Sequence, residues 1–245
     1  MRQGLPRRRR RLRAADRGRG HRAVPRRPRA VPHAPRGRCL VNAPRFITID
    51  GPGGVGKTTV TAAVAKLLRA EGHKVHPTRE PSDSPIGQLA RHGTDEYRGM
   101  SMACLIAADR YRHVEEEIRP ALAHGHVVVC DRYVPSSLVL QVMDGTPRDV
   151  VWELSRHADM PDLAVIINAT VGAVARRLEA RGAHSRFERE PGGTERECAL
   201  YYEAARFLTA AGVRVLQIDA STDGPEQIAR AVVEAITEPT KGQSS

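Results

Sequence analysis

Short apolar runs alternate with longer amphipathic segments from residue 45 onward. This alternation predicts strands at 46–50, near 74–78, and at 127–130, 163–168 and 213–219. Between them, Val60, Val64 and Leu67 recur at the spacing of one helix face, which predicts a helix over 58–69, and further helical patterns cover 101–123 and begin near Pro225. Strands that alternate with helices predict an α/β fold, a five-stranded parallel sheet flanked by helices. Ligands bind such sheets beyond the carboxyl ends of the strands.

The charge of the chain is unevenly distributed. Its 245 residues carry a formal net charge of +11, but residues 1–40 hold 15 Arg and one acid, which leaves the remainder at −3. A strongly basic chain would normally suggest nucleic acid or an anionic membrane as a partner. Here that inference concerns only the first 43 residues, whose Arg- and Pro-rich composition predicts a disordered arm.

Two interpretations of the arm remain open. It holds phosphate backbones by counterion release, or it is an upstream mis-start and translation begins at Val41. We expect residues 44–240 to form one domain and 241–245 to be a flexible tail. The sequence has no membrane-length apolar run and no secretory signal, so neither export nor a membrane partner is expected.

Cysteines and isolated aromatics suggest no chemistry of their own. Four cysteines are scattered without metal-site spacing, which fits a reducing, cytoplasmic location. Cys104 and Cys130 lie in apolar runs and are expected to be buried. Trp152 and the Tyr201-Tyr202 pair are expected to pack in the core.

The segment from Gly51 to Thr58 matches GxxxxGK[ST] and stands between a predicted strand and a predicted helix. Glycines let the backbone wrap a phosphate, so that N–H groups and the helix N-terminus face its oxygens. Lys57 adds charge for the β and γ phosphates, and Thr58 offers a hydroxyl to Mg²⁺. The motif predicts an ATP or GTP site, but a GTPase would also need a guanine-reading NKxD motif, which the chain lacks. The predicted nucleotide-binding residues are Gly51, Pro52, Gly53, Gly54, Val55, Gly56, Lys57, Thr58 and Thr59.

Asp131 follows the apolar strand 127–130, where a carboxylate is the usual second anchor for Mg²⁺ or acts as a base. Phosphoryl transfer also needs arginines to neutralise charge, and the P-loop contains none. Arginines cluster around Gly182 and predict an Arg-rich lid at about 180–194, although each alone is typical of a solvated helix face. The predicted lid arginines are Arg177, Arg181, Arg186 and Arg189, and the predicted catalytic residues are Lys57, Asp131, Arg132, Arg177, Arg181 and Arg186.

Several motifs occur in an ordered series over residues 45–236. They are the P-loop, Thr78-Arg79-Glu80-Pro81, Ala107-Ala108-Asp109-Arg110, Asp131-Arg132-Tyr133 with Ser136, Ser137 and Gln141, and Arg186-Phe187-Glu188. In this series the chain resembles the thymidylate kinase family of nucleoside monophosphate kinases. The resemblance implies a P-loop NTPase fold, ATP with Mg²⁺ as donor, a nucleoside monophosphate as acceptor, and a homodimer.

The resemblance also implies an acceptor site. Arg79 and Arg132 would hold the acceptor phosphate, Arg110 would face the base edge, and Ser137 and Gln141 would lie near the base. The residues implied for the acceptor site are Arg79, Glu80, Pro81, Ile106, Arg110, Arg132, Ser136, Ser137, Leu140 and Gln141.

Three positions depart from the family pattern. Gly53 stands where the family usually has an Asp, Ile106 where a Phe stacks on thymine, and Leu140 where many members have a Tyr that crowds a ribose 2′-hydroxyl. The leading prediction is transfer from ATP to dTMP. The alternatives are a kinase of this fold with another or modified nucleotide as acceptor, and a nucleic-acid-binding P-loop ATPase that uses the Arg-rich arm.

Overall fold

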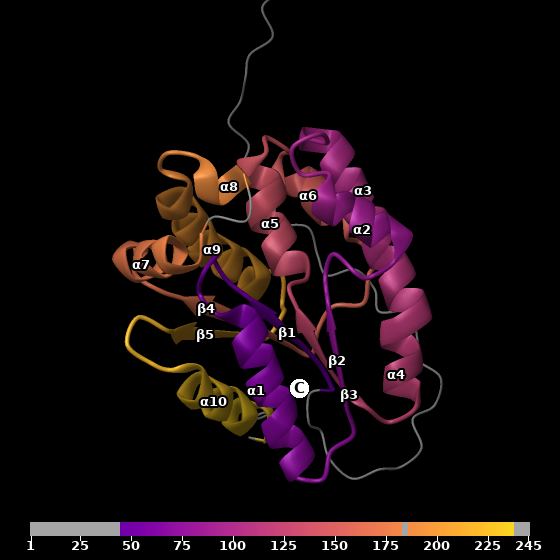
Figure 1. Cartoon of the computed structure of the whole chain (residues 1–245). Helices are drawn as coiled ribbons and strands as arrows, with labels where there is room; N and C mark the ends of the chain where they lie inside the picture. The colour runs from indigo at the N-terminus through magenta and orange to yellow at the C-terminus, as the bar shows by residue number, and fades with distance from the viewer. Residues whose placement is uncertain (1–44, 183–185, 238–245) are drawn as a thin grey trace, which may run out of the picture.

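Five parallel strands form one sheet in the computed structural model, which describes residues 45–182 and 186–237 (Figure 1). The order across the sheet is β2-β3-β1-β4-β5. The strands are β1 (Phe46–Asp50), β2 (Val75–Arg79), β3 (Val127–Asp131), β4 (Leu163–Asn168) and β5 (Val215–Asp219). The predicted five-stranded parallel α/β fold is confirmed. The predicted arm and C-terminal tail lie outside the described residues.

Helices connect the strands. They are α1 (Lys57–Ala70), α2 (Pro85–His92), α3 (Gly99–His113), the π-helical η1 (Val114–Ile118), α4 (Arg119–Ala123), α5 (Val134–Met143), α6 (Arg148–Leu154), α7 (Val171–Arg181), α8 (Arg186–Arg189), α9 (Gly193–Ala210) and α10 (Pro225–Thr237). The helix predicted over 101–123 is the succession α3, η1 and α4. None of the described helices has both the length and the apolar composition needed to cross a membrane.

Both faces of the sheet are covered, which explains the unbroken apolar run of β3. Val127 and Val129 pack into a cluster with α1, α7 and α10, whereas Val128 and Cys130 pack into a second cluster with α5, α6 and α9. Successive strand side chains point to opposite faces. A strand with helices on both sides therefore needs apolar residues at every position.

Two of the expected buried side chains are exposed. Cys104 is exposed on α3, since the buried face of that helix carries Met102, Ala103 and Ala107. Tyr202 is 50% exposed, whereas its neighbour Tyr201 is fully buried. Adjacent helical residues point about 100° apart, so an aromatic pair cannot face the core together. Trp152, at 2% exposure, and buried Cys130 match the expectation.

The strand order brings three chemical segments to one edge of the sheet. In the ladder registers, Asp131 of β3 is opposite Ile49 of β1 on one side and Arg79 of β2 on the other. Asp50, the P-loop, Arg79 and Asp131 therefore meet beyond the carboxyl ends of neighbouring strands. This is the edge at which the site was expected.

Candidate active site

The P-loop, residues 51–58, joins β1 to α1 and is shaped by its glycines. A Cβ at Gly51 would lie 2.3 Å from the backbone oxygen of Ile167, so the loop passes too close to β4 for a side chain. Gly56 has φ +97° and forms the N-cap of α1. Only glycine adopts this left-handed conformation without strain. The N-terminal turn of α1 thus opens onto the loop, as phosphate binding requires.

Lys57 lies buried under the P-loop, at 6% exposure, and its Nζ donates to the Pro52 carbonyl oxygen at 2.7 Å. Burial and the charge of Arg132 together lower the pKa of this amine to about 7, against the opposing effects of Glu197, Asp131 and Asp50. The phosphates of a nucleotide would supply the negative charge that restores the ammonium form.

Thr58 and Asp131 lie next to each other, as the sequence predicts for a metal pair. The Thr58 Oγ1 hydroxyl donates to Asp131 Oδ2 at 2.5 Å, and Asp131 Oδ1 is buried without a hydrogen-bond partner among the described residues. Both groups offer hard oxygen atoms, which Mg²⁺ prefers. This orphaned oxygen beside a P-loop hydroxyl fits the ion.

Arg132 has an unusual backbone conformation beside the P-loop. Its φ is +70°, in the left-handed region that disfavours side chains, and its amide donates to Ile49 O at 2.9 Å. Its Nη1 is buried without a partner among the described residues. Burial lowers its pKa, but the charges of nearby acids, Glu197 and Asp131 among them, raise it overall. Strain of this kind is typical of functional sites, and an unsatisfied buried guanidinium is suited to an anion.

Ser136 is used by the protein itself. Its hydroxyl donates to Asp50 Oδ1 at 2.6 Å and contacts the Tyr201 hydroxyl at 3.0 Å. Asp50 also accepts the backbone amides of Tyr133 and Ser136. Burial raises the pKa of Asp50 despite these hydrogen bonds. Ser136 thus holds the end of β1 in place, and its hydroxyl is engaged there.

Arg110 lies at the centre of the expected acceptor site, at 2% exposure. Its guanidinium donates to Glu80 Oε2 at 2.9 Å, to Ser155 Oγ at 3.0 Å and to Ser137 Oγ at 2.7 Å. The structure therefore brings Arg110, Glu80 and Ser137 together. Glu80 serves as the counter-ion of Arg110, and such pairing fixes the direction of a guanidinium.

Three further acceptor-site candidates belong to the helices α3 and α5. Ile106 lies one turn before Arg110 on α3, and Leu140 and Gln141 belong to the last part of α5. Ile106 and Leu140 are half-buried, whereas Gln141 is 5% exposed and its Oε1 has no partner among the described residues. A buried amide oxygen without a donor is suited to a ligand N–H.

Arg79 and Pro81 have local partners. Arg79 is half exposed at the end of β2, and its Nη2 donates to Asp83 Oδ1 at 2.6 Å. Pro81 follows Glu80 through a cis peptide bond, and its carbonyl oxygen accepts a hydrogen bond from Arg91. Arg79 stays at the correct strand end, but its charge is paired in this conformation.

The structure does not bring the predicted lid arginines together over the P-loop. Arg177 donates to Ala220 O at 2.8 Å, beyond β5. Arg186 pairs with Asp144 at 2.6 Å, and Arg189 with Asp95 at 2.8 Å. Arg181 is the last residue of α7, but its side chain and residues 183–185 lie outside what the structure describes. The Arg-rich lid stays a prediction.

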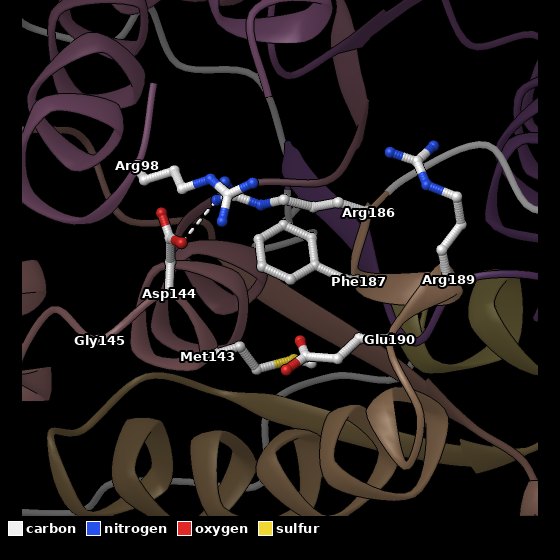
Figure 2. Close-up of a pocket in the computed structure, with 8 residues that line it drawn as sticks. All are labelled: Arg98, Met143, Asp144, Gly145, Arg186, Phe187, Arg189 and Glu190. Carbon is white, nitrogen blue, oxygen red and sulfur yellow. Dashed lines mark ion pairs between the residues drawn. The ribbon is translucent and has the colours of Figure 1, made fainter. Parts of the chain in front are cut away.

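A cavity of about 500 Å³ lies between α8 and the C-terminal end of α5 (Figure 2). Figure 2 shows the Arg186 guanidinium extending above Phe187 toward Asp144, with 4.7 Å between the guanidinium carbon and the ring centre. Asp144 also accepts the Gly99 amide at 2.5 Å. No P-loop residue lines this cavity, so it does not contain the phosphate site.

One acidic residue at the site was not predicted from the sequence. Glu197 of α9 is 4% exposed and accepts the backbone N–H of Gly53 at 3.1 Å. The two residues are 144 positions apart. No motif includes Glu197. The only indication of its burial is its spacing along α9, which places it on the buried face of that helix.

Comparison with known proteins identifies the family. The family model for thymidylate kinase matches residues 49–231. The thymidylate kinase of Thermomicrobium roseum is 38% identical over 205 residues, covering 80% of this chain and 96% of its own. That of Clavibacter michiganensis subsp. michiganensis is 39% identical over 202 residues, covering 76% and 92%. The probable thymidylate kinase of Caldivirga maquilingensis is 39% identical over 148 residues, covering 59% and 72%. The chain belongs to the thymidylate kinase family, whose members are ATP-dependent nucleoside monophosphate kinases.

Proposed function

We propose that this protein transfers the γ-phosphoryl group of ATP to the 5′-phosphate of dTMP. An oxygen of the acceptor phosphate bonds to the γ-phosphorus, and the bond from that phosphorus to the β–γ bridging oxygen breaks, which yields dTDP and ADP. The observation that carries the proposal is the unpartnered, buried Nη1 of Arg132 beside the Thr58–Asp131 pair. An anion receptor next to a nucleotide loop suits a second phosphate.

The residues of the chain act mainly by alignment and charge. The acceptor oxygen is already anionic, so the step needs no strong general base. P-loop amides and Lys57 hold the donor phosphates, and Arg132 holds the acceptor phosphate within reach of them. Positive groups that face the transferring phosphoryl lower the barrier because they are fixed before the reaction begins. Arginines of the predicted lid, when they close, would complete this neutralisation and exclude water.

Thr58 and Asp131 would hold Mg²⁺ by their side-chain oxygens. The ion, when bound, neutralises the β and γ phosphates. Thr58 supplies a neutral ligand and Asp131 a charged one, and the orphaned Asp131 Oδ1 keeps acceptor capacity for a ligand or its water.

Gln141 favours a base with an N–H at the position of pyrimidine N3. Its buried Oε1 has no partner among the described residues and is free to accept a hydrogen bond. Thymine and uracil donate one from N3, whereas cytosine does not. Ile106 on α3 and Leu140 on α5 are both half-buried, and neither side chain is aromatic. These two side chains support the alternative that another or modified nucleotide is the preferred acceptor.

The remaining expectations belong to this proposal. We infer a catalytic domain over 44–240 that works as a homodimer in the cytoplasm, with a lid near 180–194. Among the described residues, Cys104, Cys130 and Cys198 form no disulfide, which fits a reducing compartment. Analytical ultracentrifugation of the full chain tests the dimer.

A panel of nucleoside monophosphates with ATP and Mg²⁺ tests the function. ADP and diphosphate product are measured for wild type, with a no-acceptor control and Lys57→Ala. We expect dTMP to give the highest kcat/KM and Lys57→Ala to abolish turnover. No acceptor above the control would refute the kinase, and stimulation of ADP release by DNA alone would favour the ATPase. If acceptors work and dTMP is among the poorest, the substrate assignment is wrong.

A further inference from the structure

Glu197 places a carboxylate of α9 directly against the P-loop. Its Oε1 and Oε2 both accept the Gly53 backbone N–H, each at 3.1 Å. The side chain is 4% exposed. A buried carboxylate is unfavourable unless hydrogen bonds and positive charge compensate it. The contact therefore depends on what surrounds it.

The positive charge near Glu197 comes from two residues of the proposed mechanism. Glu197 interacts electrostatically with Lys57 and with Arg132, and it favours the charged form of both. Lys57 belongs to the donor loop, whereas Arg132 follows β3 on the acceptor side. A single carboxylate thus bears on the P-loop backbone and on both cations between which phosphoryl transfer would occur.

The helix that carries Glu197 is firmly anchored. Cys198 is buried, and Tyr201, one turn further along the same face, is fully buried. The Tyr201 hydroxyl contacts Ser136, whose hydroxyl donates to Asp50 at the end of β1. Asp50 immediately precedes the P-loop. α9 therefore holds the loop at two points, at its entry through Tyr201 and Ser136 and at Gly53 through Glu197.

Residue 53 itself contributes no side chain, and its surroundings leave little space for one. A Cβ at this position would lie 2.2 Å from Oε1 of Glu188, which belongs to α8. Glu188 of α8 and Glu197 of α9 thus both lie next to Gly53. Of the two, Glu197 accepts the hydrogen bond of the Gly53 amide.

We propose that Glu197 is a positioning residue for phosphoryl transfer. From its place on α9 it fixes residues 52–54 of the P-loop and orients the side chains of Lys57 and Arg132. This inference rests on the proposed function. Without the carboxylate, the Gly53 amide loses its acceptor, and the donor phosphates are no longer held in line with the acceptor. A displacement of about 1 Å costs roughly a hundredfold in rate.

Hydrogen exchange at the Gly53 amide tests the contact without any reaction. In the nucleotide-free full chain, we expect Glu197→Ala to speed this exchange about tenfold, as loss of one charge-assisted hydrogen bond would. Glu195→Gln is the matched control, because Glu195 lies in the same helix turn and is exposed. Exchange at the same rate in wild type and Glu197→Ala would overturn the proposal.

Steady-state kinetics test the positioning role. For Glu197→Ala we expect kcat to fall roughly a hundredfold with the KM for ATP nearly unchanged. More than one ADP should form per dTDP, because water competes with a misaligned acceptor. Glu197→Gln, whose amide oxygen still accepts the Gly53 N–H, should recover most of the loss, and Glu195→Gln should match wild type.

Two outcomes would show that Glu197 is merely structural. The first is an ADP-to-dTDP ratio of one in a slowed Glu197→Ala variant, and the second is a Glu197→Gln variant no better than Glu197→Ala. If Glu197→Ala fails to fold, the proposal is tested on Glu197→Gln by its ADP-to-dTDP ratio and by hydrogen exchange at its Gly53 amide. Failure of the proposed function is distinguishable, because wild type would then not phosphorylate dTMP and the exchange result would still stand.

Discussion

The hydroxyl of Thr58 donates to Asp131 at 2.5 Å, although 73 residues separate them in the chain. Thr58 lies in the first turn of α1, directly after the loop that leaves β1, and Asp131 ends β3. Because β1 and β3 are hydrogen-bonded neighbours, their carboxyl ends meet at this point. The pair forms the corner of the site at which we propose that Mg²⁺ binds.

Asp131→Asn should weaken the response to Mg²⁺. The amide keeps the shape of the side chain but removes its charge, so we expect kcat/KM to fall by about 10²–10³ and the free Mg²⁺ needed for half-maximal rate to rise. Initial rates across a Mg²⁺ titration measure both. Asp223→Asn, at an exposed site, is the control. An unchanged Mg²⁺ requirement would remove Asp131 from the metal site.

Arg132→Lys should impair acceptor use selectively. Lysine keeps the charge but lacks the planar fork that binds phosphate with two donors. We expect the KM for dTMP to rise by roughly tenfold or more, the factor that 1.4 kcal/mol represents, while the KM for ATP changes little. Initial rates with dTMP varied at saturating ATP, and with ATP varied at saturating dTMP, provide the measurement. Equal changes in both constants would argue against an acceptor role.

The backbone of Arg132 yields a separate stability prediction. Its φ of +70° disfavours any side chain, and glycine is exempt from this cost. Arg132→Gly should therefore be more stable than Arg132→Ala by about 1 kcal/mol. Urea denaturation of the two variants measures the difference. Because both variants lack the charge of Arg132, its loss does not affect the comparison. Equal stabilities would mean that the strain is relieved elsewhere.

Aromatic side chains at Ile106 and Leu140 should sharpen acceptor choice. Ile106→Phe adds a ring to the acceptor side of α3, and stacking is worth roughly 1–3 kcal/mol per base. Leu140→Tyr adds bulk on α5. The double variant should raise the preference for dTMP over its ribonucleotide about tenfold or more, measured as a ratio of kcat/KM values. If the ratio does not change, these side chains do not face the acceptor.

His113 should make stability depend on pH. Burial lowers its pKa, but hydrogen bonds to Glu117 and Glu80 outweigh burial and raise the pKa from the ordinary value of 6.5 to about 9. The Thr78 hydroxyl also contacts its ring at 2.8 Å, and His76 pairs with Glu117 on the outer side. The folded state thus binds the proton more tightly than the unfolded state.

The stabilisation from His113 is fully present below pH 6.5 and is lost as pH rises through about 9. The difference in unfolding free energy between wild type and His113→Gln should therefore shrink between pH 6 and pH 9.5. Urea denaturation at several pH values measures it. A constant difference across that range would mean that His113 is neutral in the folded protein.

Local signals made most of the fold predictable. Apolar runs identified the central strands β1, β3 and β4, because a strand covered on both faces needs apolar residues throughout. The edge strands β2 and β5 were also predicted, although they are only partly buried. Several helices were missed, among them the short α2 and α6 and the longer α5 and α9. For α2 a signal existed, since Ser84 caps it and Pro85 occupies its first turn. One amphipathic turn or two carry too little periodicity to stand out.

Residues 51–58 and Asp131 could be assigned from the sequence because spacing and strand ends encode them. The sequence alone determined a parallel α/β fold with a nucleotide loop, and the motif series indicated the family. Tertiary structure decided which polar groups have partners. It engaged Arg110 with Glu80 and Ser137, it paired Arg186 with Asp144, and it brought Glu197 to Gly53. These contacts join residues far apart in the chain, and their geometry follows from how whole helices pack on the sheet, which no local pattern specifies.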